Sequence, residues 1–491
     1  MREIDCPPHA PALMESMRSV GYSLESALAD LIDNSLSAGA SAIDLQFRSS
    51  GDPYLALIDN GRGMSPTEID AAMRHGSRSP LETRAGDDLG RFGLGLKTAS
   101  MSQCRRFTVV SARDGVISGR CWDIDIVNSS MKWTMLALDE REIEAVPHVD
   151  RLHANGSGTI VVWRTLDRLL AGESNEQAAL DQKVDASREH LALVFHRYIS
   201  GEPRHKAVSI SINGSPLKAI DPFLRDHMAT QPLDDDDFTI EGKKVRVKPF
   251  ILPHLSKLSA QDAARAGGTE GLRSRQGFYV YRNRRLIVWG TWFRLAKKDE
   301  LSKLARVRVD IPNSLDHLWT LDIKKAIAYP PEAVRNNLRR TVDKIVGRSR
   351  HTYTFRGRKA ASPDLHHGWE RVVTRSGVKY QICRTHPALE AVRSRLVGSD
   401  QALFGALLDV LEDSFPFDAV YADMASDTDV SLPSEDEKKR LRDSAFAIAR
   451  ALRPGTVPFK GFVSSLGRIE PFSQFPDYAR ELALEIEDAV R

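Results

Sequence analysis

Residues 29–40 read ADLIDNSLSAGA, and this stretch is the first of three short segments that decide the fold. It belongs to a run with helical spacing that is broken at Gly21, so we predict two helices, the second one capped by Ser23. Asp30 and Asn34 are four residues apart, so they share one helix face and can point at one ligand. A carboxylate beside an amide suits a magnesium–phosphate site, although an exposed polar helix face has the same pattern.

The second segment, DNGRGM at residues 59–64, directly follows an apolar strand predicted over 54–59. An Asp at the end of a strand can accept a hydrogen bond from an exocyclic amine, and Gly61 and Gly63 allow the backbone to approach a flat ring. The same residue types form ordinary tight turns, so this segment alone leaves both interpretations open.

The third segment, GRFGLGLKTAS at residues 90–100, is a glycine-rich loop that runs into the start of a helix. Free backbone N–H groups and the positive end of a helix dipole suit a phosphate, and Lys97 adds a cation. The spacing matches neither a Walker A loop nor a dinucleotide fingerprint. On its own this segment indicates little; its place after the other two gives it meaning.

In this order, with a later strand that begins near Thr159, the three segments resemble the Bergerat fold of the GHKL ATPases. That family includes gyrase B, MutL, the heat-shock chaperones, histidine kinases and MORC proteins. Residues 29–40 resemble the first box of the family, and the stretch GRFGLGLKTASMS resembles its MORC form. The resemblance covers residues 10–195 and implies a protein that binds and hydrolyses ATP with Mg²⁺.

The resemblance implies a role for each site residue. Asn34 is expected to ligate Mg²⁺, Asp59 to bind the adenine amine, and Thr159 to assist Asp59 through water. Asp30 stands where the family usually has the Glu that polarises the attacking water, and because Asp is shorter, slow turnover is expected. Asp33 is a poorer candidate, since it lies off the helix face that carries Asn34. The other residues expected at the nucleotide, some of them in a lid over 75–96, are Gly61, Gly63, Met64, Gly90, Arg91, Phe92, Gly93, Leu94, Gly95, Leu96 and Lys97.

The chain is long enough for several domains. At 491 residues it exceeds what one hydrophobic core usually serves. The predicted strands, among them 116–125, 131–138 and 277–289, and the predicted helices, among them one over 387–414, come in clusters rather than in strict alternation, so the fold class is α+β. We expect a Bergerat-fold ATPase sandwich over 1–198, a transducer-like α+β domain over 199–348, a linker over 349–368, and a hairpin followed by a mostly helical C-terminal domain over 369–491.

The domain order also carries information, because histidine kinases place this fold at the C-terminus. A nucleotide fold followed by a second α+β domain resembles the gyrase, MutL, heat-shock and MORC branch instead. In that branch a transducer lysine reaches the γ-phosphate, and residues 319–325 offer Lys324 and Lys325, between which the pattern does not decide. The branch further implies that ATP closes the lid and pairs two copies, with residues 1–20 at the interface.

Composition limits the partners. The net charge is +3, no stretch approaches the ~18 apolar residues of a membrane span, and four widely spaced cysteines suggest reduced thiols, so a cytoplasmic protein is expected. Basic clusters over 282–298 and 335–359 could follow a DNA backbone, although a solvated helix face has the same composition. The leading hypothesis is an ATP-switched homodimeric clamp on DNA, in genome defence or maintenance. The alternative is a chaperone-like ATPase acting on protein partners, with the C-terminal domain as a docking module.

Overall fold

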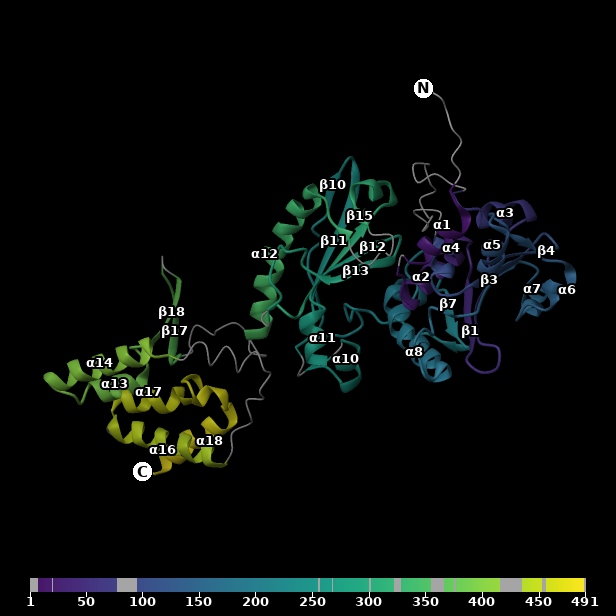
Figure 1. The fold of residues 1–491 in the computed structure, drawn as a ribbon. Coiled ribbons are helices and arrows are strands. Elements are labelled where there is room, and N and C mark those ends of the chain that lie inside the picture. The colour runs from purple at the N-terminus through teal and green to yellow at the C-terminus, as the bar shows by residue number, and fades with distance from the viewer. Residues whose placement is uncertain are drawn as a thin grey trace, which may run out of the picture. The chain divides into compact units, whose positions relative to one another are not determined.

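The computed structural model describes residues 8–19, 21–76, 95–254, 257–266, 268–299, 302–321, 328–354, 366–374, 377–415, 435–452 and 456–489. It divides the chain into two compact units, Met1–Thr354 (unit 1) and Phe355–Arg491 (unit 2). Figure 1 shows that unit 1 mixes sheets and helices, whereas unit 2 is mostly helical. The fold class is therefore α+β, as predicted.

Unit 1 begins with an eight-stranded sheet in the order β5-β4-β3-β6-β2-β1-β7-β8. Its strands are β1 Ala42–Arg48, β2 Tyr54–Asp59, β3 Arg106–Arg113, β4 Val116–Asp123, β5 Leu136–Ala137, β6 Gly158–Arg164, β7 Ser209–Ile212 and β8 Ser215–Pro216. Neighbouring strands are antiparallel except β1 and β7, which run parallel. The register of β2 and β6 places Asp59 opposite Thr159, so two predicted site residues meet at one end of the sheet.

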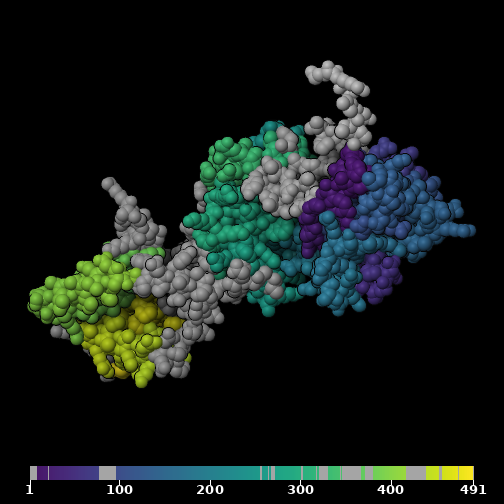
Figure 2. Space-filling view, viewed as in Figure 1, coloured from purple at the N-terminus to yellow at the C-terminus, as the bar shows by residue number. Residues whose placement is uncertain are grey.

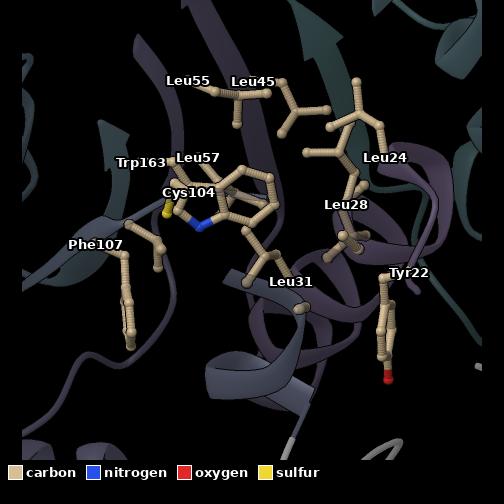
Figure 3. Packing of buried hydrophobic residues seen from close by; sticks show 14 of the residues in the cluster. Tyr22, Leu24, Leu28, Leu31, Leu45, Leu55, Leu57, Cys104, Phe107 and Trp163 are labelled. Carbon is tan, nitrogen blue, oxygen red and sulfur yellow. The ribbon is translucent and has the colours of Figure 1, made fainter. Parts of the chain in front are cut away.

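Helices pack on both faces of this sheet, because its central strands are apolar on both sides. Leu55 and Leu57 of β2 join one core and Ala56 and Ile58 join the other, as strand alternation requires. The first core is covered by α1 Ala10–Arg18, α2 Leu24–Ser37, α4 Gly95–Met101 and α8 Glu176–Val194. The second core is covered by α6 Glu140–Glu144 and α7 Val149–Asn155. Figure 3 shows Trp163 of β6 packed among the leucines of the first core.

Helix α2 starts and ends where the sequence predicts. The Ser23 side chain accepts a hydrogen bond from the Ser26 N–H and caps the first turn. The two glycines that flank the helix, Gly21 and Gly39, have φ values of +73° and +76°, which suit glycine at helix boundaries. Helix α1 precedes it, and the purple surface in Figure 2 belongs to the N-terminal part of the chain that includes both helices.

Three predicted strands are wrong in extent or placement. The strand predicted over 116–125 ends at Asp123, because that side chain caps the helix α5 Ile124–Ser130. The strand predicted over 131–138 shrinks to β5. Strand β7, which the sequence analysis assigns to the second domain, pairs with β1 and completes the first sheet. We call the part of unit 1 from α1 to β8 the first lobe; it also contains α3 Pro66–Met73 and α9 His196–Ile199.

The rest of unit 1, called the second lobe, is built on another sheet in the order β10-β11-β14-β12-β13, with β9 beside β11. Its strands are β9 Gln231–Pro232, β10 Phe238–Ile240, β11 Lys243–Ile251, β12 Gly277–Arg282, β13 Arg285–Thr291 and β14 Ala305–Ile311. The strand predicted over 277–289 is in fact the β12–β13 hairpin, because Asn283 and Arg284 adopt positive φ and turn the chain. The short elements are α10 Ala260–Arg265, α11 Gly268–Ser274, η2 Asn313–Leu318, β15 Thr320–Leu321 and β16 Ala328–Tyr329. Helix α12 Glu332–Thr354 covers the sheet with Val334, Leu338 and Ile345.

Unit 2 contains a hairpin and helices around a small core. The hairpin is β17 Trp369–Thr374 and β18 Gly377–Ile382, and the helical elements are α13 Pro387–Arg393, α14 Ser399–Asp413, α16 Glu435–Ala451, α17 Val457–Ser465, η3 Leu466–Arg468, η4 Phe472–Gln474 and α18 Pro476–Asp488. The predicted helix over 387–414 is two helices separated at Gly398, whose φ is +57°. No helix in the described ranges has both the length and the apolar character that a membrane span needs.

Candidate nucleotide site

Asp59 is the centre of one half of the site. It ends β2, is 4% exposed, and accepts hydrogen bonds from the Ser35 hydroxyl at 2.7 Å, from the Gly61 N–H at 2.9 Å and from the Thr159 N–H. Burial raises the pKa of Asp59, and these three donors oppose that shift. An ionised carboxylate offers about four acceptor positions. The carboxylate can therefore take one further donor, which fits the exocyclic amine of adenine.

Behind Asp59, the hydroxyl groups of Ser111 and Thr159 connect β3, β6 and the turn that follows β2. The Ser111 hydroxyl lies 2.9 Å from that of Thr159, donates to the Gly158 carbonyl at 2.9 Å, and accepts from the Met64 N–H at 2.8 Å. Ser111 itself has no exposed surface. Since buried hydroxyls that are fully bonded hold their neighbours in one geometry, this network fixes the Thr159 side chain beside Asp59.

The glycines after Asp59 are required by close backbone contacts. A Cβ on Gly63, whose φ is +66°, would lie 1.9 Å from the Ala112 carbonyl oxygen. A Cβ on Gly61 would lie 2.9 Å from the Ala38 side chain. Any side chain at these positions would therefore push the turn away from β3 or from the end of α2. The structure places both glycines next to Asp59, where the sequence analysis expects the base.

The other half of the site lies on α2, one to two turns before Ser35. Asp30 is 6% exposed and accepts a hydrogen bond from the Tyr22 hydroxyl at 3.1 Å. Figure 3 shows that this hydroxyl points away from the apolar side chains around it. A Cβ on Gly95, the first residue of α4, would lie 3.5 Å from Asp30 Oδ2, so the end of the glycine-rich segment meets this carboxylate. Asn34, one turn further along α2, is exposed, as a ligand for a solvated ion should be.

Asp33 forms a buried ion pair that the sequence did not predict. Its carboxylate accepts from Arg285 Nε at 2.7–2.8 Å, and the two side chains are 2% and 8% exposed. Arg285 begins β13 of the second lobe, so this pair joins the lobes directly at the helix that carries Asp30. The same guanidinium has its Nη2 3.9 Å from Asp30 Oδ1.

Lys97 is buried and hydrogen-bonded inside the first lobe. It is 2% exposed, and its Nζ donates to the Ala72 carbonyl at 2.8 Å, at the end of α3. Burial lowers the pKa of Lys97 to about 8. The neighbouring Leu96 packs on the first core. Gly90, Arg91, Phe92, Gly93 and Leu94, and the pair Lys324 and Lys325, lie outside the described residues.

The basic cluster over 282–298 is largely used inside the protein, which corrects its assignment as a DNA-binding surface. Arg282 pairs with Asp316 at 2.8 Å and is 7% exposed, and Arg285 is buried against Asp33. The Arg284 guanidinium stacks 4.3 Å above the Tyr198 ring. Exposed basic residues of that range remain at Arg294, Lys297 and Lys298, while α12 presents Arg335, Arg339 and Arg340.

The comparisons with known proteins agree with this geometry. The family model for histidine kinase-, DNA gyrase B- and HSP90-like ATPases matches residues 22–159, the range that holds α2, β2, α4 and the start of β6. This part of the chain is therefore a GHKL ATPase domain with the Bergerat fold. No group of three or more His, Cys, Asp and Glu that could hold a metal occurs among the described residues.

The relatives among known proteins match short parts of this chain. The DNA mismatch repair protein MutL of Agrobacterium fabrum is 30% identical over 95 residues, which is 19% of this chain and 16% of MutL. The ATPase MORC2B of Mus musculus is 33% identical over 96 residues, 19% of this chain and 9% of the relative. The chain thus matches less than a fifth of these relatives' lengths. Among solved structures, the N-terminal domain of a DNA repair protein aligns with 68% of this chain and 98% of its own, at 16% identity and a TM-score of 0.42.

Sequence reasoning missed the residues that support the site. Ser111 interrupts the apolar run FTVVSA, and a lone polar residue in such a strand is the signal that could have identified it. Ser35 directly follows Asn34, and it lies off the helix face that Asn34 shares with Asp30. Arg285 gave no usable signal, since it is 252 residues from Asp33.

Proposed function

We propose that this protein binds Mg-ATP between α2, the end of β2 and α4, hydrolyses it slowly, and uses the cycle as a homodimeric clamp on DNA. The arrangement that carries the proposal is the buried Asp59 carboxylate, held by Ser35, Gly61 and Thr159 with one acceptor position to spare. A hydrogen-bonded Asp at a base site rejects ligands without a matching donor, because its buried oxygen would then stay unsatisfied. At position 6 of the purine, ATP supplies that donor through its amine, whereas GTP carries a carbonyl oxygen, which can only accept.

For hydrolysis, we assign Asp30 to orient and deprotonate the attacking water and Asn34 to hold Mg²⁺ through its amide oxygen. Mg²⁺, bound by few protein oxygens and by the phosphates, would neutralise the charge that develops on the phosphate oxygens. Asp30 is buried and held by the Tyr22 hydroxyl, so its carboxylate has one preferred orientation. Because Asp is shorter than the usual Glu, its reach toward the phosphate is reduced and turnover is slow. The proposal keeps Lys324 or Lys325 at the γ-phosphate and residues 90–97 around the phosphates.

The DNA part of the proposal has two supports. Relatives include a DNA mismatch repair protein, and α12 turns Arg335, Arg339 and Arg340 outward while its apolar residues face the second-lobe core. Exposed arginines one turn apart can each neutralise a phosphate. We further propose a C-terminal domain over 369–491, dimerisation through residues near the N-terminus, and action in the cytoplasm.

One set of binding experiments tests nucleotide recognition. Titration with ATP, GTP and a non-hydrolysable ATP analogue, each with Mg²⁺, should show tight binding of both ATP forms and weak binding of GTP. Asn34→Ala should abolish Mg²⁺-dependent binding, whereas Asn175→Ala, an exposed cap residue far along the chain, should leave it unchanged. Equal binding of ATP and GTP would contradict the assigned role of Asp59.

A second experiment tests the clamp. Sizing by light scattering, with and without the analogue and with and without DNA, should show a dimer only with the analogue. DNA should raise ATP turnover with a steep salt dependence, and the Arg335→Ala/Arg339→Ala/Arg340→Ala variant should lose most of that effect. The control Lys132→Ala/Lys206→Ala/Lys218→Ala removes the same charge from exposed positions of the first lobe. Stimulation by an unfolded protein in place of DNA would favour the chaperone-like alternative.

A further inference from the structure

The contact between the two lobes of unit 1 reaches the helix that carries the proposed catalytic carboxylate. Arg285 is the first residue of β13, and its Nε lies 2.7 Å from Asp33 on α2. Both side chains are at least nine-tenths buried. A buried ion pair of this kind requires good geometry to offset the loss of hydration, so its two ends are fixed relative to each other.

The same guanidinium extends toward Asp30. Its Nη2 lies 3.9 Å from Asp30 Oδ1, while the Tyr22 hydroxyl of the first lobe bonds Asp30 Oδ2 at 3.1 Å. The Asp30 carboxylate is therefore held from two sides, by a tyrosine of the first lobe and by an arginine of the second. Gly95 at the start of α4 also lies next to this carboxylate, on the side where we place the phosphates.

The hairpin that carries Arg285 is itself anchored on the first lobe. The Tyr198 hydroxyl donates to the Asn283 carbonyl at 2.6 Å, and the His196 ring lies 2.8 Å from the Tyr281 hydroxyl. Arg284 covers the Tyr198 ring. These contacts come from α9 of the first lobe, so the docking of the β12–β13 hairpin on α9 fixes where Arg285 meets α2.

We propose that Arg285 is a positioning residue for ATP hydrolysis, through which the second lobe sets the orientation of Asp30. The inference rests on the proposed function, since it takes Asp30 as the residue that activates water. Arg285 touches neither nucleotide nor water in this account; it acts through Asp33 and Asp30. The planar guanidinium suits this task, because two carboxylates three residues apart on one helix can share its fork, whereas a lysine would offer a point charge.

The test compares two arginines that both join the lobes. Arg285→Gln removes the contact to Asp33 and Asp30, whereas Arg275→Gln removes the pair between Arg275 and Glu189 of α8, at 3.1 Å, which does not involve α2. We expect Arg285→Gln to lower kcat about 10- to 100-fold, since a small misplacement of a catalytic group has effects of that size. The Kd of the non-hydrolysable analogue should change by no more than about threefold, and Arg275→Gln should resemble the wild type.

A second variant keeps the inference testable if Arg285→Gln does not fold. Asp33→Asn/Arg285→Met removes both charges of the Asp33–Arg285 pair together, and it should show the same fall in kcat with the same Kd. Arg285→Gln or the double variant turning over ATP as fast as Arg275→Gln would overturn the inference while leaving the proposed function intact. An equal loss of kcat and of analogue affinity would overturn it as well, because that result describes general damage. A wild-type chain that binds no ATP would overturn the proposed function and this inference together.

Discussion

The two halves of the candidate site are built in different ways. The base-binding half is defined by Asp59, Ser35, Gly61, Ser111 and Thr159, and every one of its contacts lies within the first lobe. The hydrolytic half is defined by Asp30, Asp33, Tyr22 and Arg285, and it joins side chains 252 residues apart from both lobes. Figure 1 shows α2 between the first-lobe sheet and the strands of the second lobe.

This difference separates binding from turnover. The proposed base-binding half is complete once the strands β2, β3 and β6 are in register. The proposed hydrolytic half is complete only when β13 is docked on α2. Under the proposed function, ATP can therefore bind to the first lobe, whereas its hydrolysis also requires the docked second lobe.

The largest expected effect is on the hydrolytic half. Asp30→Asn should lower turnover about 10²- to 10⁴-fold, because the amide cannot take a proton from water. The Asn side chain can still accept from the Tyr22 hydroxyl, so the fold and nucleotide affinity should be kept. Phosphate release and analogue titration measure the two quantities. Glu25→Gln is the matched control on the same helix, and unchanged turnover in Asp30→Asn would remove Asp30 from the mechanism.

The next effect concerns the bond between the lobes. Arg285→Met leaves Asp33 charged and buried without its arginine, and should lower the free energy of unfolding by about 3–5 kcal/mol. The double variant Asp33→Asn/Arg285→Met should recover most of that loss. The exposed pair of Arg164 and Asp52 provides the control, since Arg164→Met should change stability by about 1 kcal/mol or less. Urea unfolding measures all three, and additive losses in the double variant would show that the pair does not act as a unit.

A smaller effect is expected in the base-binding half. Asp59→Asn should weaken ATP binding about 10- to 100-fold, the loss of one charged hydrogen bond, because an NH₂ group would face the base amine. The variant should still fold. Burial raises the pKa of Asp59, so ionisation of this carboxyl lowers stability as pH rises toward the folded pKa, and Asn has no charge to bury. A thermal melt separates lost binding from lost folding, and tight ATP binding by this variant would argue against the base site.

The smallest effect is a pH dependence that belongs to Lys97. Its pKa is lowered to about 8 by burial, and a phosphate nearby would raise it again, so binding takes up a proton above that pH. Analogue affinity should be constant below about pH 8 and fall by at most about tenfold per unit above it. Lys97→Arg, charged throughout, should flatten this profile. A profile that is the same in both proteins would mean that Lys97 stays on the Ala72 carbonyl.

The same contrast explains what the sequence could predict. Short segments with fixed spacing encode the proposed base-binding half, so α2 and β2 form where the sequence predicts them and Asp59 lies opposite Thr159, and the family model matches the same range. The sequence could not predict the pairing of Asp33 with Arg285, because neither local sequence contains a pattern that identifies a distant partner. Arg282 and Arg285 therefore suggested a DNA-binding surface, whereas each is buried against an acidic partner in the interior. Long-range ion pairs leave no local pattern.

The parallel strand β7 has a practical consequence for dissecting this protein. A fragment that ended at residue 199 would remove the neighbour of β1 and leave its backbone N–H and C=O groups along an open edge, a form that tends to aggregate. Leu217 is buried and its N–H donates to the Ile210 carbonyl at 2.8 Å, so the β7–β8 edge of the sheet is complete only with that residue. A soluble nucleotide-binding fragment should therefore extend past Leu217, well inside what the sequence suggests is the next domain.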